Sequence, residues 1–102
     1  MKITGREKIE NCVKGEFVYK YFFDSVWTKE SILNMASLGG LKYYESFPRP
    51  MFKVVRPDGT IIKGVLSADK CRVIFPRSGA DAAALKFETR MREIFQEPTK
   101  EG

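Results

Sequence analysis

The tetrapeptide Arg56-Pro57-Asp58-Gly59 constrains the fold of this chain more than any other feature of the sequence. Proline presets a tight turn, and glycine supplies the positive φ that such a turn needs. The segments on either side, residues 51–55 and 60–66, are rich in β-branched and apolar side chains. The pattern predicts a β-hairpin.

More strands are predicted on both sides of this hairpin. Ser67-Ala68-Asp69-Lys70 forms a second turn into the apolar run 71–75, which Pro76 ends, so three successive strands form an antiparallel meander. Residues 16–23 and 41–46 also have the composition and alternation of strands. The two prolines of segment 47–50 exclude it from a central strand, because proline donates no ladder hydrogen bond.

Two segments have the apolar spacing of amphipathic helices. We expect Thr28 to cap the first helix and Gly39-Gly40 to end it in the left-handed conformation. Its apolar stripe consists of Ile32, Leu33, Met35 and Ala36. We expect Ser78 to cap the second helix, with Asp81 three residues on. Its stripe consists of Ala80, Ala83, Ala84, Phe87, Met91, Ile94 and Phe95.

The length of 102 residues fits one α+β domain, residues 1–102, with a single core. We expect two layers: an antiparallel sheet of four or five strands in the order β-α-β-β-β-β-α, with both helices packed on one face. In residues 1–15, the spacing of Ile9, Cys12 and Val13 and the position of Gly15 leave a short N-terminal helix as one interpretation.

The surplus positive charge lies in the most β-structured part of the chain. Residues 42–77 hold eight basic and three acidic side chains, whereas the rest of the chain holds ten of each. Because alternate residues of a strand point to opposite faces, the basic residues of several strands can share one face. Such a face favours an anionic partner.

The period-2 pattern assigns one sheet face to the core and leaves the other as the candidate binding surface. The core face takes Phe17, Tyr19, Tyr21, Phe23, Leu41, Tyr43, Phe52, Val54, Ile62, Leu66, Cys71, Val73 and Phe75. The candidate binding residues are Lys20, Phe22, Lys42, Tyr44, Lys53, Val55, Ile61, Lys63, Val65, Arg72 and Ile74, with Val18 beside them.

Two binding functions fit this mixture of cations, rings and aliphatic side chains. The first is self-association, such as a homodimer, or binding of a protein partner, with the lysine stems lying along an apolar contact. The alternative is single-stranded nucleic acid, with cations on phosphates and bases stacked on rings. The face also fits a third interpretation, an ordinary solvated surface on which long basic side chains cover aliphatic ones.

A second, weaker anion site is Arg77-Ser78-Gly79, where free amides of a helix start lie beside a guanidinium. Simple capping of the helix explains the same residues. We expect no metal site and no cofactor, because the chain has two cysteines and lacks histidine, the commonest metal ligand.

Catalysis is not expected either. Without histidine, nucleophilic triads that need an imidazole are excluded, and no phosphate-cradling glycine loop or nucleophile elbow is present. The chain has no apolar stretch of about 20 residues and no signal-like apolar segment at its start. We therefore expect a cytoplasmic protein that does not enter membranes, in which Cys71 is a buried, reduced thiol.

Overall fold

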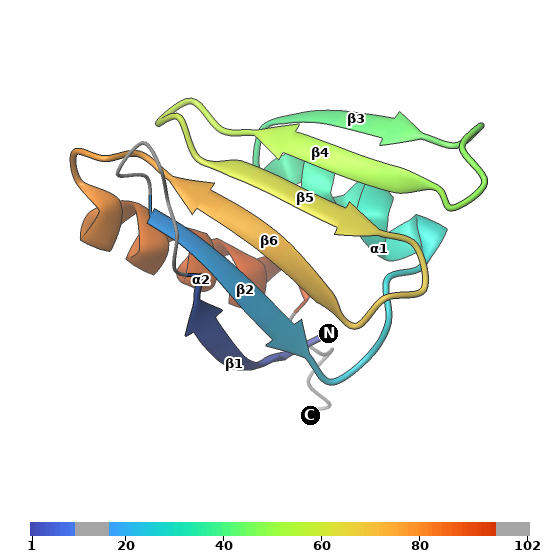
Figure 1. The fold of residues 1–102 in the computed structure, drawn as a ribbon, viewed down its shortest axis with the longest axis horizontal. Coiled ribbons are helices and arrows are strands. Elements are labelled where there is room, and N and C mark those ends of the chain that lie inside the picture. The colour runs from blue at the N-terminus through green and yellow to red at the C-terminus, as the bar shows by residue number, and fades with distance from the viewer. Residues whose placement is uncertain (10–16, 96–102) are drawn as a thin grey trace.

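The computed structural model describes residues 1–9 and 17–95 as a single sheet with two helices (Figure 1). In chain order the elements are β1 (Ile3–Lys8), β2 (Phe17–Phe23), α1 (Lys29–Asn34), the 3-10 helix η1 (Met35–Ser37), β3 (Gly40–Tyr44), β4 (Met51–Val55), β5 (Ile61–Val65), β6 (Lys70–Phe75) and α2 (Ala80–Ile94).

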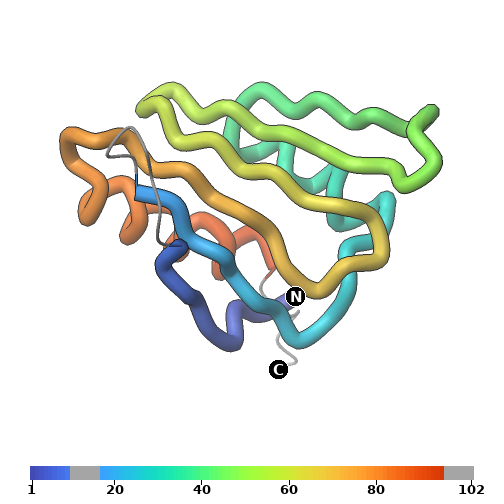
Figure 2. The backbone as a smooth tube through the Cα atoms, in the orientation of Figure 1, coloured from blue at the N-terminus to red at the C-terminus, as the bar shows by residue number. Residues whose placement is uncertain are grey.

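The sheet has six strands in the spatial order β1-β2-β6-β5-β4-β3, and every neighbouring pair is antiparallel. From β2 the chain crosses through α1 to β3 at the far edge, then returns strand by strand until β6 lies beside β2 (Figure 2). The predicted meander is therefore present, and the predicted four or five strands are one or two too few.

The additional strand is β1, which occupies part of the segment for which a helix was one interpretation. That interpretation is wrong over residues 3–8, because their backbone pairs with β2 from Ile3↔Phe23 to Lys8↔Tyr19. Arg6 also reaches across to α2, where its guanidinium pairs with Glu88 at 2.9 Å. Cys12, Val13 and Gly15 lie outside the described residues.

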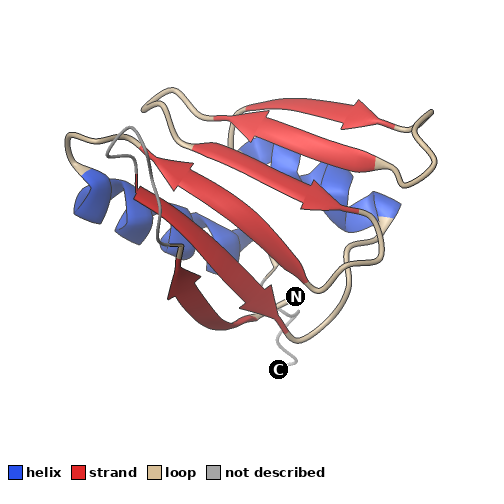
Figure 3. Cartoon of the chain, in the orientation of Figure 1, coloured by secondary structure: helices blue, strands red, loops and turns tan. Residues whose placement is uncertain are grey.

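Both helices lie on the same face of the sheet, which gives the predicted two-layer α+β architecture (Figure 3). α2 covers the half formed by β2 and β6, and α1 covers the half formed by β3, β4 and β5 (Figure 1). All thirteen residues assigned to the core face belong to the buried cluster or pack against it. The strand parity predicted from the sequence is thus confirmed.

The predicted hairpin turn joins β4 to β5. The amide of Gly59 donates to the carbonyl of Arg56 at 3.0 Å, and Gly59 has a φ of 96°. The Asp58 carboxylate accepts from the amide of Thr60 at 2.9 Å, which fixes the end of the turn. Burial acts to raise the pKa of Asp58, but the bonds from Thr60 outweigh it and the pKa is lowered.

Thr28 caps α1 as predicted, since its hydroxyl accepts from the amide of Ser31 at 3.1 Å. The predicted apolar stripe is only half right. Ile32 and Met35 are buried, whereas Leu33 is 49% exposed and Ala36 is exposed. The buried side of this short helical segment follows positions 32, 35 and 38, so residues 33 and 36 face solvent.

Glycines 39 and 40 do not end the helix in the left-handed conformation, since neither has a positive φ. Gly39 has a different role: a Cβ there would collide with the carbonyl oxygen of Val55 on β4. The absent side chain therefore lets the start of β3 approach its partner strand.

The apolar stripe of α2 is largely as predicted, with Ala83, Ala84, Phe87 and Met91 buried. Its cap is not. The N-cap residue is Gly79, with a φ of 78° and no side-chain hydrogen bond, so the predicted cap by Ser78 is wrong. The left-handed conformation at Gly79 starts the helix one residue later than a serine cap would.

Candidate functional site

The face of the sheet turned away from α1 and α2, here called the open face, carries all eleven predicted binding residues. Strand pairing places them in rows that cross the sheet, because residues directly opposite each other in antiparallel strands share a face. The helices lie behind the strands in Figure 3, so the open face is the one turned to the viewer. Their role in binding stays a prediction.

Five cations form one continuous row, the cationic row, on five neighbouring strands. Lys20 lies opposite Arg72, Arg72 opposite Lys63, Lys63 opposite Lys53, and Lys53 opposite Lys42. At the usual strand spacing of about 4.8 Å, the row is about 19 Å long and runs at right angles to the strands.

The cationic row is not neutralised by the side chains around it. The ion pairs formed between described residues are Arg6–Glu88, Lys29–Glu45 and Arg90–Glu93, which leave the row out. Among the described strand positions on the open face, the one acidic residue is Glu7, opposite Lys20 at the end of the row. Like charges directly opposite each other destabilise a sheet, so this arrangement has a cost in the free protein.

A hollow of about 390 Å³ lies beside Lys20, Arg72 and Lys63, the members of the cationic row on β2, β6 and β5. Its lining includes five cations and, among the described residues, no carboxylate: Lys20, Arg49, Lys63, Lys70 and Arg72. Met51 and Val65 supply apolar surface there. The hollow therefore offers an anionic group several cations at once.

Sequence reasoning missed Arg49 and Lys70 as members of this surface. Arg49 lies in the proline segment before β4, and Lys70 was assigned to a turn but begins β6 opposite Phe22. The period-2 pattern could have found Lys70, because it lies two residues before Arg72. Nothing local in the sequence indicates that Arg49 lines the same hollow as Lys20 and Arg72.

A second row of residues lies directly beside the cationic row on this face, and it has an aromatic ring at each end. Phe22 is on β2, and Tyr44 is on the edge strand β3. The ring of Tyr44 stacks on that of Phe47 with 5.5 Å between centroids and 20° between planes. Phe47 is 48% exposed, and sequence reasoning did not place it in the site.

The row on the other side of the cations is apolar and is here called the apolar row. Val18 lies opposite Ile74, Ile74 opposite Ile61, and Ile61 opposite Val55. Val55 is 46% exposed and the other three are partly exposed. The open face thus combines a charged row with an apolar one.

The polar cluster on the helix side of the sheet holds β1, β2 and α2 together. The Tyr21 hydroxyl donates to the Glu88 carboxylate at 2.6 Å, and Arg6 donates to the same carboxylate. Burial raises the pKa of Tyr21 above its ordinary value, and the hydrogen bond to Glu88 raises it further. Both effects keep the phenol protonated, as a structural hydrogen-bond donor.

Cys71 is free and buried under the helices, as predicted. Burial raises the pKa of its thiol and so disfavours the nucleophilic thiolate. Among residues 1–9 and 17–95, no three histidine, cysteine, aspartate or glutamate side chains are grouped so that they could hold a metal ion.

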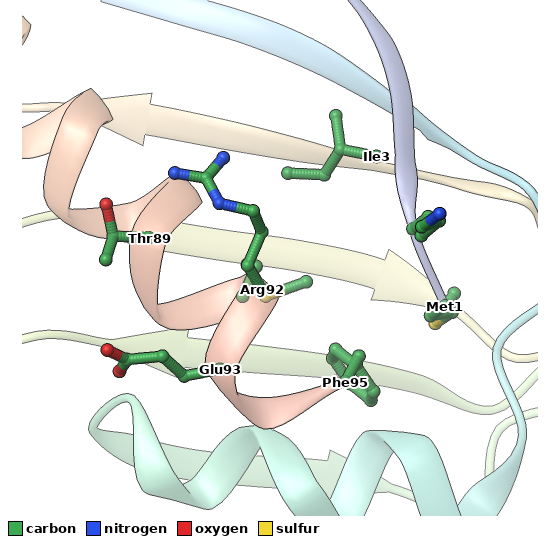
Figure 4. Close-up of a pocket in the computed structure, with 8 residues that line it drawn as sticks. Met1, Ile3, Thr89, Arg92, Glu93 and Phe95 are labelled. Carbon is green, nitrogen blue, oxygen red and sulfur yellow. The ribbon is translucent and has the colours of Figure 1, made fainter. Parts of the chain in front are cut away.

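A cavity of about 620 Å³ opens on the helix side, between the start of the chain and the last turns of α2. Figure 4 shows Met1 and Ile3 on one side of it and Arg92 and Phe95 on the other. Its charged lining residues, Lys2, Arg92 and Glu93, are of both signs. It has no surplus of cations comparable to that of the open face.

The weaker anion site predicted at Arg77, Ser78 and Gly79 lies at the start of α2, on the helix side rather than on the open face (Figure 1). All three residues are exposed, and Asp81 occupies the first turn of the helix. They do not join the cationic row.

Comparisons with known proteins give no family: no protein-family model, no curated protein and no solved structure matches this chain significantly. Within the described ranges, no helix has the length and apolar character needed to cross a bilayer.

Proposed function

We propose that this domain binds single-stranded nucleic acid on its open face. The observation that supports this most strongly is the cationic row, in which Lys20, Arg72, Lys63, Lys53 and Lys42 follow one another on directly opposite positions. Their mutual repulsion has a cost in the free protein, and a polyanion lying along the row relieves it.

The rings favour a single strand over a duplex. Phe22 and the Tyr44–Phe47 stack lie beside the cationic row, where unpaired bases can reach them. Stacking of bases on aromatic side chains beside a positively charged track is the usual way to bind single strands without sequence preference. A duplex keeps its bases stacked inside and gains nothing from exposed rings on a flat sheet.

The test is the binding of a fluorescein-labelled mixed-sequence single-stranded DNA of about 20 nucleotides, followed by anisotropy at low salt. Lys53→Gln combined with Lys63→Gln removes two central cations, and we expect the affinity to fall about tenfold or more. The matched control is Lys86→Gln with Arg92→Gln, which removes two exposed cations from α2 on the other side.

We expect the control variant to bind within about twofold of the unchanged protein. Absence of binding by the unchanged protein, or equal losses in the two variants, would contradict the proposal. Fluorescence of the single buried tryptophan, Trp27, checks that both variants are folded.

Self-association or binding of a protein partner remains a second candidate, and the apolar row is the observation that favours it. Val18, Ile74, Ile61 and Val55 form a continuous strip that a partner could cover. Two open faces brought together would also bring two cationic rows together, so an acidic or offset partner fits better than face-to-face stacking.

The second candidate is tested by light scattering at high micromolar concentration. Ile61→Asp should convert a dimer to a monomer, because it places a carboxylate at the centre of the apolar row. A monomeric unchanged protein would exclude self-association.

A further inference from the structure

We propose that a single strand bound to the open face crosses the β-strands at right angles, with its phosphates along the cationic row and its two ends at β2 and at the edge strand β3. This inference rests on the function proposed above and adds the path and length of the bound segment. It assigns Phe22 to one end of the path and the Tyr44–Phe47 stack to the other.

The direction follows from the register of the strands. Each cation of the row comes from a different strand, and consecutive members are cross-strand partners. A nucleic-acid chain lying parallel to β5 or β6 would meet one or two of these cations. A nucleic-acid chain lying across the sheet meets all five. The transverse path therefore neutralises the most charge.

The hollow supports the same path. It adjoins the row at Lys20, Arg72 and Lys63 and adds Arg49 and Lys70 to these three cations. A phosphate that enters it meets these row cations and, on the side of the row that carries the rings, Arg49 and Lys70. Positive charge is thus densest toward the β2 end of the row, and the two ring positions lie on β2 and β3.

The positions of the rings limit the path at both ends. Phe22 is on β2, opposite Lys70, and Tyr44 is on β3, the last strand of the sheet. Between β2 and β3 lie β6, β5 and β4, so the two ring positions are about 19 Å apart at the usual strand spacing. Bases near the middle of the bound segment have no comparable ring among the described residues of the open face.

The length of the row sets the length of the bound segment. At the B-form rise of about 3.4 Å per nucleotide along the helix axis, a 19 Å row spans about six nucleotides, and because phosphates laid along a line are farther apart than this rise, six is the upper limit. The affinity of oligothymidylates should therefore rise steeply with length up to about six nucleotides. Longer oligothymidylates should gain only a small statistical factor, because they can place more than one segment on the row.

The path is tested by photocrosslinking with a thymidine hexamer that carries 5-iododeoxyuridine at its first or at its last position. One hexamer should crosslink to the peptide that contains Phe22 and the other to the peptide that contains Tyr44 and Phe47. Phe22→Leu should remove the first crosslink alone, and Phe47→Leu should weaken the second alone. Each variant should lower the affinity about tenfold, the scale of one lost base–ring stack.

The outcomes separate the two proposals. Crosslinks from both ends to the same peptide, or affinity that keeps rising well beyond six nucleotides for a monomeric protein, would overturn the transverse path and leave nucleic-acid binding intact. Failure of single strands of every length to bind would overturn the proposed function and the path together. Leu85→Ala, which removes an exposed aliphatic side chain from α2, is the control that should change neither readout.

Discussion

Lys63 on β5 lies directly opposite Arg72 on β6, so two cations face each other at the centre of the sheet. Lys53 faces Lys63 from the other side, on β4. No described acidic side chain forms an ion pair with any of the three. The sheet thus concentrates charge of one sign where a purely structural sheet favours opposite or neutral pairs.

This arrangement predicts that stability and binding respond in opposite directions to one substitution. Lys63→Thr removes repulsion from both neighbours and introduces a good strand former, so the free energy of unfolding should rise by about 0.5 kcal/mol. The same change should weaken binding of single-stranded DNA. Urea unfolding followed by Trp27 fluorescence gives the first quantity, and anisotropy gives the second.

Lys42→Thr is the matched control for stability. Lys42 lies on the edge strand β3 and faces a single cation, Lys53, so its replacement should raise the free energy of unfolding by less. A Lys63→Thr protein that is less stable than the unchanged protein would show that repulsion within the cationic row does not lower the free energy of unfolding.

The close approach of Gly39 to β4 predicts a difference between two adjacent glycines. Gly39→Ala places a methyl group against the Val55 carbonyl oxygen and should destabilise the protein by about 1–3 kcal/mol. Gly40→Ala places its methyl group 3.9 Å from the same oxygen, an ordinary contact, and should cost far less. Thermal unfolding of the two variants compares them directly, and equal losses would contradict this role of Gly39.

The Tyr21–Glu88 hydrogen bond predicts a loss of stability at alkaline pH. Because the pKa of Tyr21 is raised above its ordinary value of 10.0, the folded state favours the neutral phenol. Its contribution is complete below pH 10 and is lost as the pH rises above 10 toward the folded-state pKa.

Tyr21→Phe tests this contribution. It should lower the free energy of unfolding at neutral pH by about 1–3 kcal/mol, because Glu88 loses the hydrogen bond from Tyr21 and keeps the one from Arg6. It should also make the decline above pH 10 shallower than in the unchanged protein. Urea unfolding at a series of pH values measures both effects, and parallel declines would show that Tyr21 does not titrate on unfolding.

Strands β2 to β6 and their faces could be predicted because each shows a local pattern. The turn at Pro57 and Gly59 and the alternation in β4, β5 and β6 determine both pairing and parity over short distances. β1 has no such pattern: its sequence is mostly polar, and it is held by pairing with β2 and by the Arg6–Glu88 contact between residues far apart in the chain.

The candidate site was predictable as a face but not as a row. Parity alone places Lys20, Lys53 and Lys63 on the same side of the sheet. Their alignment depends on the register of each pair and on β6 lying between β2 and β5, which a single sequence does not encode locally. Arg49 and Phe47 join the site through the loop before β4, for which the sequence showed only that proline excludes a strand.

The central claim is that the cationic row is a track for phosphates, and the salt dependence of single-strand binding tests it most directly. Five phosphate contacts predict that the logarithm of the binding constant falls with the logarithm of salt concentration with a slope of about −3.5, and Lys53→Gln with Lys63→Gln should reduce it to about −2. A slope near zero, or one that these substitutions leave unchanged, would contradict the account.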